Sequence, residues 1–310
     1  MTTTPIAAST RAASAGLPLL RGPEVAVLDA VDELVTEWGR GIGAEPVALP
    51  AMVEASDLAR IDYFTNFPHL AHSVATLDAD AAKEYADGDI QQRHLKSTSL
   101  VLPSAGCYGA YFAHSGARLD APVLLTTRAL CSRAESYYES LRRLRTFQMR
   151  EVIHIGTQRS AQEFARRGKR WLTAIVARLD LEAELRPASD PFFDAGGGRS
   201  LMQRMSKVKE ELVFGGDLAV SSVNLHRNFF GERCDIRGPE GEYAYSACLG
   251  AGLERWTHML LAAYKGDAEA AVRAVREAGA DVAAEGAEAA ADGAKATADG
   301  AEAAADGGDI

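Results

Sequence analysis

Residues 124–157 read LLTTRALCSRAESYYESLRRLRTFQMREVIHIGT. An apolar run rich in Leu and Thr opens this stretch, a polar segment with several Ser, Glu and Arg residues follows, and a second run with Phe, Val and Ile closes it. Short apolar runs on either side of a polar segment are typical of two β-strands joined by a loop. We therefore predict strands at 121–130 and 146–155.

The rest of the chain repeats this hairpin-like arrangement. Apolar periodicity predicts further strands at 97–102, 211–214, 218–225 and 242–248, and helices at 23–38, 161–179 and 253–264. Strand pairs at short spacing favour antiparallel pairing, whereas a doubly wound parallel sheet needs a crossover between successive strands. The sequence thus predicts an α+β fold, a large antiparallel sheet flanked by helices.

The composition describes a soluble globular chain. Its 310 residues include 33 Lys and Arg against 43 Asp and Glu, which gives a net charge of −10. This charge disfavours a chain-wide nucleic-acid binder, because such a protein needs a basic surface to replace counterions. No apolar run is long enough for a membrane span, and residues 1–20 lack the apolar core of a secretory signal. We expect a cytoplasmic protein with no membrane partner.

The negative charge is concentrated at the C-terminus. Residues 267–310 hold 11 acidic and 3 basic residues, and a heptad that begins with Gly repeats at 286, 293 and 300. Glycine in every second turn costs a helix about 1 kcal/mol each, and such a segment buries too little apolar surface to offset that cost. We expect a flexible N-terminus at 1–20, one folded domain at 21–266 and a disordered tail at 267–310.

Signature residues stand at defined places in the hairpin of residues 124–157. The first strand ends in Arg133-Ala-Glu135, the loop is rich in arginine, and the return strand carries Phe147 and Glu151. Farther on, Cys248-Leu-Gly-Ala-Gly-Leu-Glu-Arg255-Trp is a glycine-rich strand end followed by a helix that opens with Arg. In this order, the two segments resemble the second and third signature motifs of class II aminoacyl-tRNA synthetases. The resemblance implies that the folded domain is a catalytic domain of that superfamily.

One branch of this superfamily carries zinc in its amino-acid pocket. It comprises the atypical seryl-tRNA synthetases of methanogens and their truncated relatives, the amino acid:[carrier protein] ligases. The chain resembles this branch at Cys107, Glu151 and Cys248, which match the family's zinc ligands. Two thiolates and a carboxylate leave one coordination position open, as in catalytic zinc sites, and the family's zinc uses it for the amino group of the substrate. Cys131 and Cys234 fall outside the triplet and are interpreted as packing residues.

The resemblance also implies an ATP site with Mg²⁺. Arg133 would contact the α-phosphate and the substrate carboxylate, and Arg255 would lie against the adenine or the γ-phosphate, since guanidinium groups suit both phosphates and aromatic rings. Glu135 would accept hydrogen bonds from the adenine, and Phe147 would stack on it. The remaining candidates are Glu211 for Mg²⁺, with the adjacent Glu210 left open as the alternative, and Asn224 for the amino acid.

These assignments imply ATP-dependent activation of a small amino acid, with glycine or alanine favoured, as an aminoacyl-adenylate. The activated amino acid would then pass to the phosphopantetheine thiol of a carrier protein. Only 106 residues precede Cys107, too few for a large tRNA-binding domain in addition to the strands of the core, so tRNA is disfavoured as a partner. Seryl-type tRNA or minihelix aminoacylation and a catalytically silent amino-acid sensor stay open as alternatives.

Two protein interfaces are also expected. Class II domains dimerise through a first motif, a helix and a strand with proline, which we place within residues 60–104, so the resemblance implies a homodimer. A basic stretch on the predicted helix 161–179 could meet an acidic carrier protein, although an ordinary exposed helix face explains it equally well. This stretch comprises Arg159, Arg166, Arg167, Lys169 and Arg170.

Overall fold

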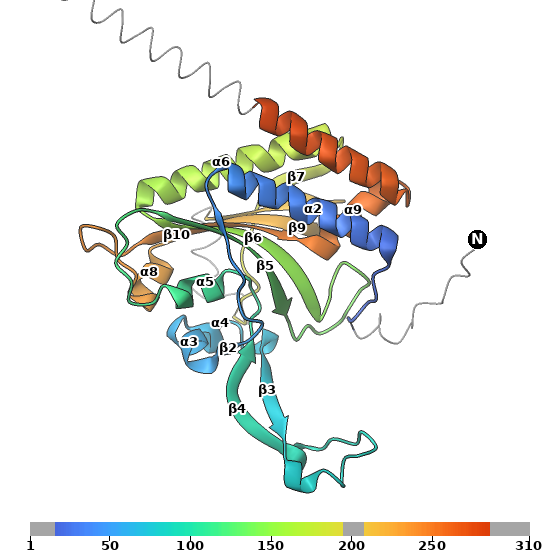
Figure 1. Ribbon diagram of the computed structural model, residues 1–310, viewed down its shortest axis with the longest axis vertical. Coiled ribbons are helices and arrows are strands. Elements are labelled where there is room, and N and C mark those ends of the chain that lie inside the picture. The colour runs from blue at the N-terminus through green and yellow to red at the C-terminus, as the bar shows by residue number, and fades with distance from the viewer. Residues whose placement is uncertain (1–15, 195–207, 286–310) are drawn as a thin grey trace, which may run out of the picture.

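The computed structural model describes residues 16–194 and 208–285, and its centre is a seven-stranded sheet (Figure 1). The strand order is β1-β5-β6-β10-β9-β8-β7, and every neighbouring pair is antiparallel except β1 and β5. The strands are β1 (Glu45–Pro46), β5 (Val123–Ser132), β6 (Thr146–Gly156), β7 (Ala183–Pro187), β8 (Lys209–Phe214), β9 (Leu218–Arg227) and β10 (Tyr245–Gly252). The predicted antiparallel sheet flanked by helices is confirmed.

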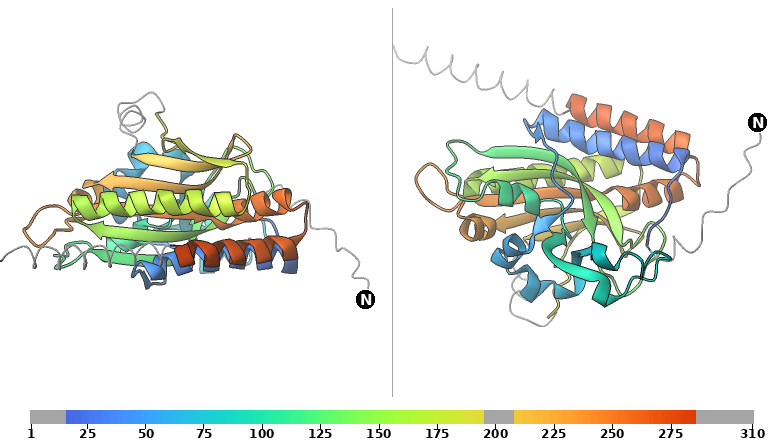
Figure 2. Two further views of the ribbon diagram at one scale, coloured as in Figure 1. Left: turned by 90° about the horizontal axis from the view of Figure 1, so that it is seen from above. Right: turned by 60° about the horizontal axis from the view of Figure 1, so that its bottom comes forward.

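Long helices cover one face of this sheet (Figure 2). They are α2 (Gly22–Gly41), α6 (Gln158–Arg178), α9 (Leu253–Ala263) and a helix over residues 268–285. Helix α2 begins with a proline in its first turn, where the missing N–H costs nothing, and repeats buried Val, Leu and Ala at helical spacing. These side chains pack with Val152, Leu249 and Trp256 into the larger of two apolar cores.

Short helices and a second sheet lie on the opposite face. The helices are α3 (Ala55–Arg60), α4 (Tyr63–Asn66), α5 (Tyr108–Ala113) and α8 (Phe229–Cys234), and the second sheet has the order β2 (Val53–Glu54), β4 (Leu95–Leu102), β3 (His72–Leu77). The hairpin of β3 and β4 extends away from the main sheet (Figure 1). A smaller apolar core, which includes Cys107, Ile153 and Cys248, lies between these elements and the main sheet and packs them together.

The domain limits expected from the sequence need correction at both ends. Residues 268–285 form a helix in which Ala271, Val275 and Ala278 are buried in the larger core, so the folded domain continues well past residue 266. Residues 286–310 lie outside the described residues. At the other end, Gly16 accepts a hydrogen bond from the backbone N–H of Arg145, which ties residue 16 to the domain, whereas residues 1–15 lie outside the description.

Within residues 60–104, where a proline-containing helix and a strand were expected, a proline stands in a helix of only three residues, Pro68–Leu70, which is followed by β3. That segment forms short helices and most of the second sheet, whereas a helix followed by a strand with proline occurs earlier, as α2 and β1. The strand expected at 242–248 is displaced to β10, because the chain makes a turn before Tyr245. Within the parts of the chain that are described, no helix has the length and apolar character needed to cross a bilayer.

Candidate active site

Two adjoining cavities open on the face of the main sheet that carries the short helices. The first has a volume of about 440 Å³ and the second about 400 Å³. Both are lined by Arg133, Met149, Asp190, Pro191, Lys209 and Ser222. Because these residues line both cavities, ligands in the two cavities would lie against a shared wall that includes Arg133.

Thiols and an imidazole converge in the first cavity. Cys107 precedes the first turn of α5, Cys248 lies on β10 and His226 lies near the end of β9, yet their ligand atoms are all within 4.8 Å of one another. Both cysteines are almost fully buried. The structure therefore brings together two of the three predicted metal ligands, and it adds a histidine that the sequence analysis did not assign.

Glu151, the third predicted ligand, lies on the neighbouring strand β6 beside Cys248, although it is not a member of the metal-binding group found among the described residues. Its carboxylate lies between Gly106 and Gly250, where a Cβ at either position would come within 3.3 Å of it. The residue is 4 % exposed and its Oε2 has no hydrogen-bond partner. Burial, together with the adjacent Cys248, raises the pKa of Glu151 well above its usual range. A buried carboxylate oxygen without a partner is costly, so this donor set fits a metal ion.

The two cysteines are electrostatically unequal. A hydrogen bond from the Cys107 thiol to Cys248 Sγ holds the pKa of Cys248 well below its usual range and raises the pKa of Cys107 well above it. Asn224 Nδ2 also donates to Cys248 Sγ at 3.4 Å. One sulfur is thus prepared as a thiolate, the form in which cysteine binds metals. Cys131 and Cys234, also buried, are not members of the metal-binding group found among the described residues.

The second cavity contains every residue that the sequence analysis assigned to ATP, namely Arg133, Glu135, Phe147, Glu211 and Arg255. The Arg133 guanidinium lies 5.0 Å from the centre of the Phe147 ring, and its Nε donates to the Ser104 carbonyl at 3.1 Å. Glu135 pairs with Arg143 at 2.6 Å. A planar cation beside an aromatic ring provides a surface for a base and a contact for phosphate oxygens.

Arg255 is held by neutral groups rather than by a carboxylate. Its Nε donates to the Arg142 carbonyl at 2.8 Å and its Nη1 to the Ala219 carbonyl at 2.9 Å. Burial, with the nearby cations Arg133 and Arg143, lowers the pKa of Arg255 to about 10. The guanidinium therefore stays charged at neutral pH, in a partly desolvated place where an anion would stabilise it.

The structure separates the two adjacent acidic residues of β8. Glu211 lines the second cavity and its carboxylate is 3.0 Å from Lys209 Nζ. Glu210 points the other way and pairs with Lys169 of α6 at 2.5 Å. Neighbouring residues on a strand face opposite sides of a sheet, so only Glu211 is available to a ligand in the cavity.

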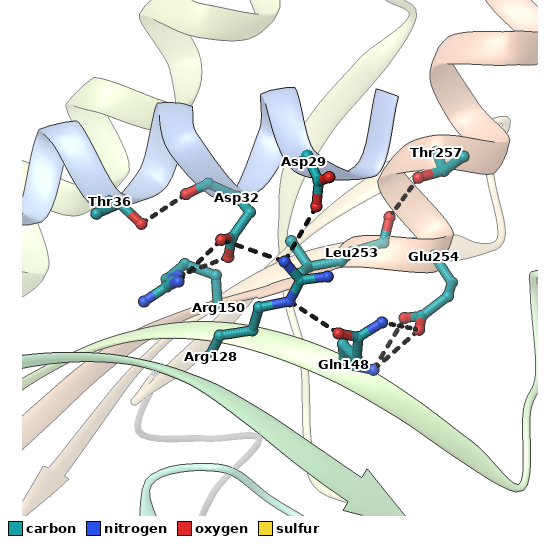
Figure 3. A network of polar contacts seen from close by, with 9 residues as sticks. All are labelled: Asp29, Asp32, Thr36, Arg128, Gln148, Arg150, Leu253, Glu254 and Thr257. Atoms are coloured by element: carbon teal, nitrogen blue, oxygen red, sulfur yellow. Dashed lines mark hydrogen bonds and ion pairs between the residues drawn. The ribbon is translucent and has the colours of Figure 1, made fainter. Parts of the chain in front are cut away.

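Behind the sheet, a polar network fixes the strand and the helix that carry the ATP residues (Figure 3). Glu254, the residue before Arg255, accepts hydrogen bonds from the backbone N–H of Gln148 at 3.0 and 3.1 Å. Arg150 makes two hydrogen bonds to Asp32 of α2, at 2.7 and 2.9 Å. Since Gln148 and Arg150 alternate along β6 with Phe147, Met149 and Glu151, this network holds the cavity-facing residues in position.

The basic stretch on α6 does not face the cavities. Helix α6 belongs to the layer on the opposite side of the sheet. Arg166 and Arg170 pair with Glu163, and Lys169 pairs with Glu210. A carrier protein bound there would be separated from both cavities by the main sheet, so the structure speaks against this helix as its docking surface.

Comparison with known proteins shows that this chain is similar in sequence to ligases. No protein-family model matches the sequence. Two curated relatives from Bradyrhizobium diazoefficiens, amino acid–[acyl-carrier-protein] ligases 1 and 2, are 29 % and 30 % identical over 243 and 260 residues. These alignments cover 74 % of both chains for ligase 1, and 77 % of this chain and 76 % of the relative for ligase 2. The type-2 serine–tRNA ligase of Methanocaldococcus jannaschii is 22 % identical, over 78 % of this chain and 51 % of its own.

The fold agrees with these relatives. A crystal structure of Methanopyrus kandleri seryl-tRNA synthetase with an Aquifex aeolicus tRNA superposes with a TM-score of 0.70 at 22 % identity, over 81 % of this chain and 54 % of that one. Pyrococcus horikoshii seryl-tRNA synthetase with ATP superposes with a TM-score of 0.59 at 15 % identity, over 82 % and 54 %. The fold is therefore that of a class II aminoacyl-tRNA synthetase catalytic domain, and the chain belongs to the amino acid–[acyl-carrier-protein] ligase family.

Proposed function

We propose that this protein activates a small amino acid with ATP as an aminoacyl-adenylate and transfers it to the phosphopantetheine thiol of a carrier protein. One observation carries the proposal. Two cavities share a wall that includes Arg133, and one contains soft metal-ligating groups while the other contains arginines and an aromatic ring. A cavity for an amino acid next to a cavity for a nucleotide is what adenylate formation requires.

In the first cavity, Cys107, Glu151 and Cys248 would hold zinc. The opposite pKa shifts of the two adjacent thiols and the unpartnered oxygen of Glu151 support this assignment, because a metal ion would bind thiolates and give that oxygen a partner. When bound, zinc supplies a Lewis acid that holds the amino group of the substrate. Asn224 lines this cavity beside Cys248 and would contact the same substrate. The favoured substrates are glycine and alanine.

In the second cavity, Phe147 would stack on the adenine and Glu135 would accept hydrogen bonds from it. Arg255 would contact the adenine or the γ-phosphate, and Glu211 would hold Mg²⁺. The half-buried Phe147 ring, which lines the cavity beside the Arg133 guanidinium, and the carbonyl-held guanidinium of Arg255 support these roles. Because these groups are held in place before the nucleotide binds, they can stabilise its charges without reorganising.

Arg133 stands where the reaction would take place. The substrate carboxylate oxygen attacks the α-phosphorus, a new O–P bond forms, and the bond to pyrophosphate breaks. Both reactants are anions, so a cation that touches the carboxylate and the α-phosphate together lowers their repulsion. In the second step the phosphopantetheine thiolate attacks the acyl carbon, a thioester forms and AMP leaves. The names of the two Bradyrhizobium relatives support a carrier protein as the acceptor.

The test is amino-acid-dependent ATP–pyrophosphate exchange, followed by transfer to holo-carrier protein or to bulk tRNA. We expect exchange with glycine or alanine and transfer to the carrier. Exchange with transfer only to tRNA or a minihelix would contradict the acceptor, and absence of exchange with every amino acid would favour a silent sensor. For the metal, Cys107→Ala and Cys248→Ala should lose zinc, whereas the matched control Cys131→Ala should keep about one zinc per chain.

A further inference from the structure

Segment 188–193, which follows β7, forms one side of the first cavity. Its far end is anchored at the end of α4. There the Phe192 ring stacks on Phe67, with the ring centres 5.1 Å apart. The backbone N–H of Phe193 donates to the Asn66 carbonyl at 2.8 Å. The segment thus connects the main sheet to the short helices, and it contributes to the wall of the amino-acid cavity together with residues of α4.

The near end of the segment is held by Lys209, the first residue of β8. The Lys209 carbonyl accepts a hydrogen bond from the N–H of Ala188 at 3.0 Å, and its Nζ lies 2.7 Å from the Asp190 carboxylate. The same Nζ lies 3.0 Å from the Glu211 carboxylate. Burial lowers the pKa of Lys209, but the two carboxylates outweigh this effect and raise it above its usual range. The ammonium is therefore charged and is shared between segment 188–193 and β8.

Lys209 lies where the two cavities adjoin. Among the described residues, Arg133 and Lys209 are the two cations that line both cavities. Glu211 lines the nucleotide cavity, whereas Asp190 belongs to the segment beside the amino-acid cavity. An ammonium that already contacts two carboxylates has little net charge left for an anionic ligand. Lys209 is therefore better suited to hold these two acidic residues than to bind a phosphate, the role proposed for Arg133.

From this geometry we propose that Lys209 is a positioning residue that couples the two cavities, because one ammonium holds both segment 188–193 and Glu211. The inference rests on the proposed function for the assignment of the cavities to amino acid and ATP. Without the cation, the carboxylates of Asp190 and Glu211 would repel each other. A ligand that orders Glu211 therefore also orders the segment through Lys209, and the reverse holds too. Each ligand should then raise the affinity for the other by the same factor, typically about 5–150-fold for coupled sites.

Hydrogen–deuterium exchange of the full chain tests the anchoring without an activity assay. In Lys209→Met the amides of segment 188–193 should exchange about fivefold faster or more than in the wild-type protein. Asp190→Asn weakens the same ion pair and should have the same effect, so that a folding defect of one variant cannot decide the outcome. The matched control is Lys169→Met, because Lys169 pairs with Glu210 on the other side of the sheet. Wild-type exchange in both Lys209→Met and Asp190→Asn would overturn the inference.

The coupling itself is measured by calorimetric titration with α,β-methylene-ATP and Mg²⁺, with and without saturating glycine or alanine. In the wild-type protein the amino acid should tighten binding of this analogue about fivefold or more. The gain should disappear in Lys209→Met, persist in Lys169→Met, and largely return in Lys209→Arg, which keeps the charge. Coupling retained in Lys209→Met, or none in the wild-type protein, would overturn the inference. A wild-type protein that binds neither the analogue nor an amino acid would instead refute the proposed function.

Discussion

Replacement of Asp32 by alanine should destabilise the protein far more than replacement of its neighbour Asp29. Arg150 contacts Asp32 through two hydrogen bonds, and the two side chains are only 11 % and 15 % exposed. Removing one partner of a fully buried pair costs roughly 3–5 kcal/mol. Since a little water reaches this pair, we expect Asp32→Ala to lower the free energy of unfolding by about 2–3 kcal/mol, which corresponds to a Tm decrease of roughly 5–10 °C.

Asp29 provides the matched control on the same face of α2. Its carboxylate is 3.1 Å from Arg128 Nη1, but it is 56 % exposed, and an exposed pair of this kind contributes about 0.5 kcal/mol or less. Urea unfolding of both variants measures the difference. Adding Arg150→Met to Asp32→Ala should recover part of the loss, because the unpaired cation is then removed. Equal destabilisation by Asp29→Ala and Asp32→Ala would refute the view that this network holds β6 against α2.

Three further predictions concern catalysis, pH and the C-terminal helix. Arg133→Ala and Arg255→Ala should each lower pyrophosphate exchange about a hundredfold or more without loss of zinc, and exchange at the wild-type rate in both would contradict their role at the phosphates. Burial lowers the pKa of His154 to about 4. Protonation of His154 is therefore unfavourable in the folded state, and its contribution to the free energy of unfolding is fully present above about pH 6.5. The free energy of unfolding falls by about 3 kcal/mol as the pH drops to 4, because the unfolded state then binds a proton more readily than the folded state. In His154→Leu the urea midpoint should vary less between pH 4 and 6.5 than in the wild-type protein. The same dependence of the midpoint on pH in both proteins would contradict the lowered pKa of His154. Deletion of residues 268–310 should cost roughly 3 kcal/mol or more in urea unfolding, because Ala271, Val275 and Ala278 are buried, whereas deletion of 286–310 should leave stability unchanged. A stable chain that ends at residue 267 would show that the helix contributes little.

Much of the fold was predictable because the relevant signals are local. The helical periodicity of α2 and the apolar runs of β5 and β6 depend only on residues close together in the chain. Arg133 and Glu135 were predictable for the same reason, because they follow directly on a strand, and both line the second cavity. Local patterns could not predict the helix at 268–285. Small alanine and valine side chains gain stability there only because Leu34 of α2 and its neighbours offer a surface that they fit.

The sequence by itself determined the residue types of the site and most of the elements that carry them, because spacing along a strand or helix sets which face a side chain takes. Only the tertiary structure decided which of these side chains meet. Glu210 and Glu211 are indistinguishable by pattern, and the sheet sends one to α6 and the other to the cavity. His226 stands two residues after Asn224, a strand spacing that could have drawn attention to it. It reaches the thiols through the bulge in β9 and the distances between three elements, which no local pattern encodes.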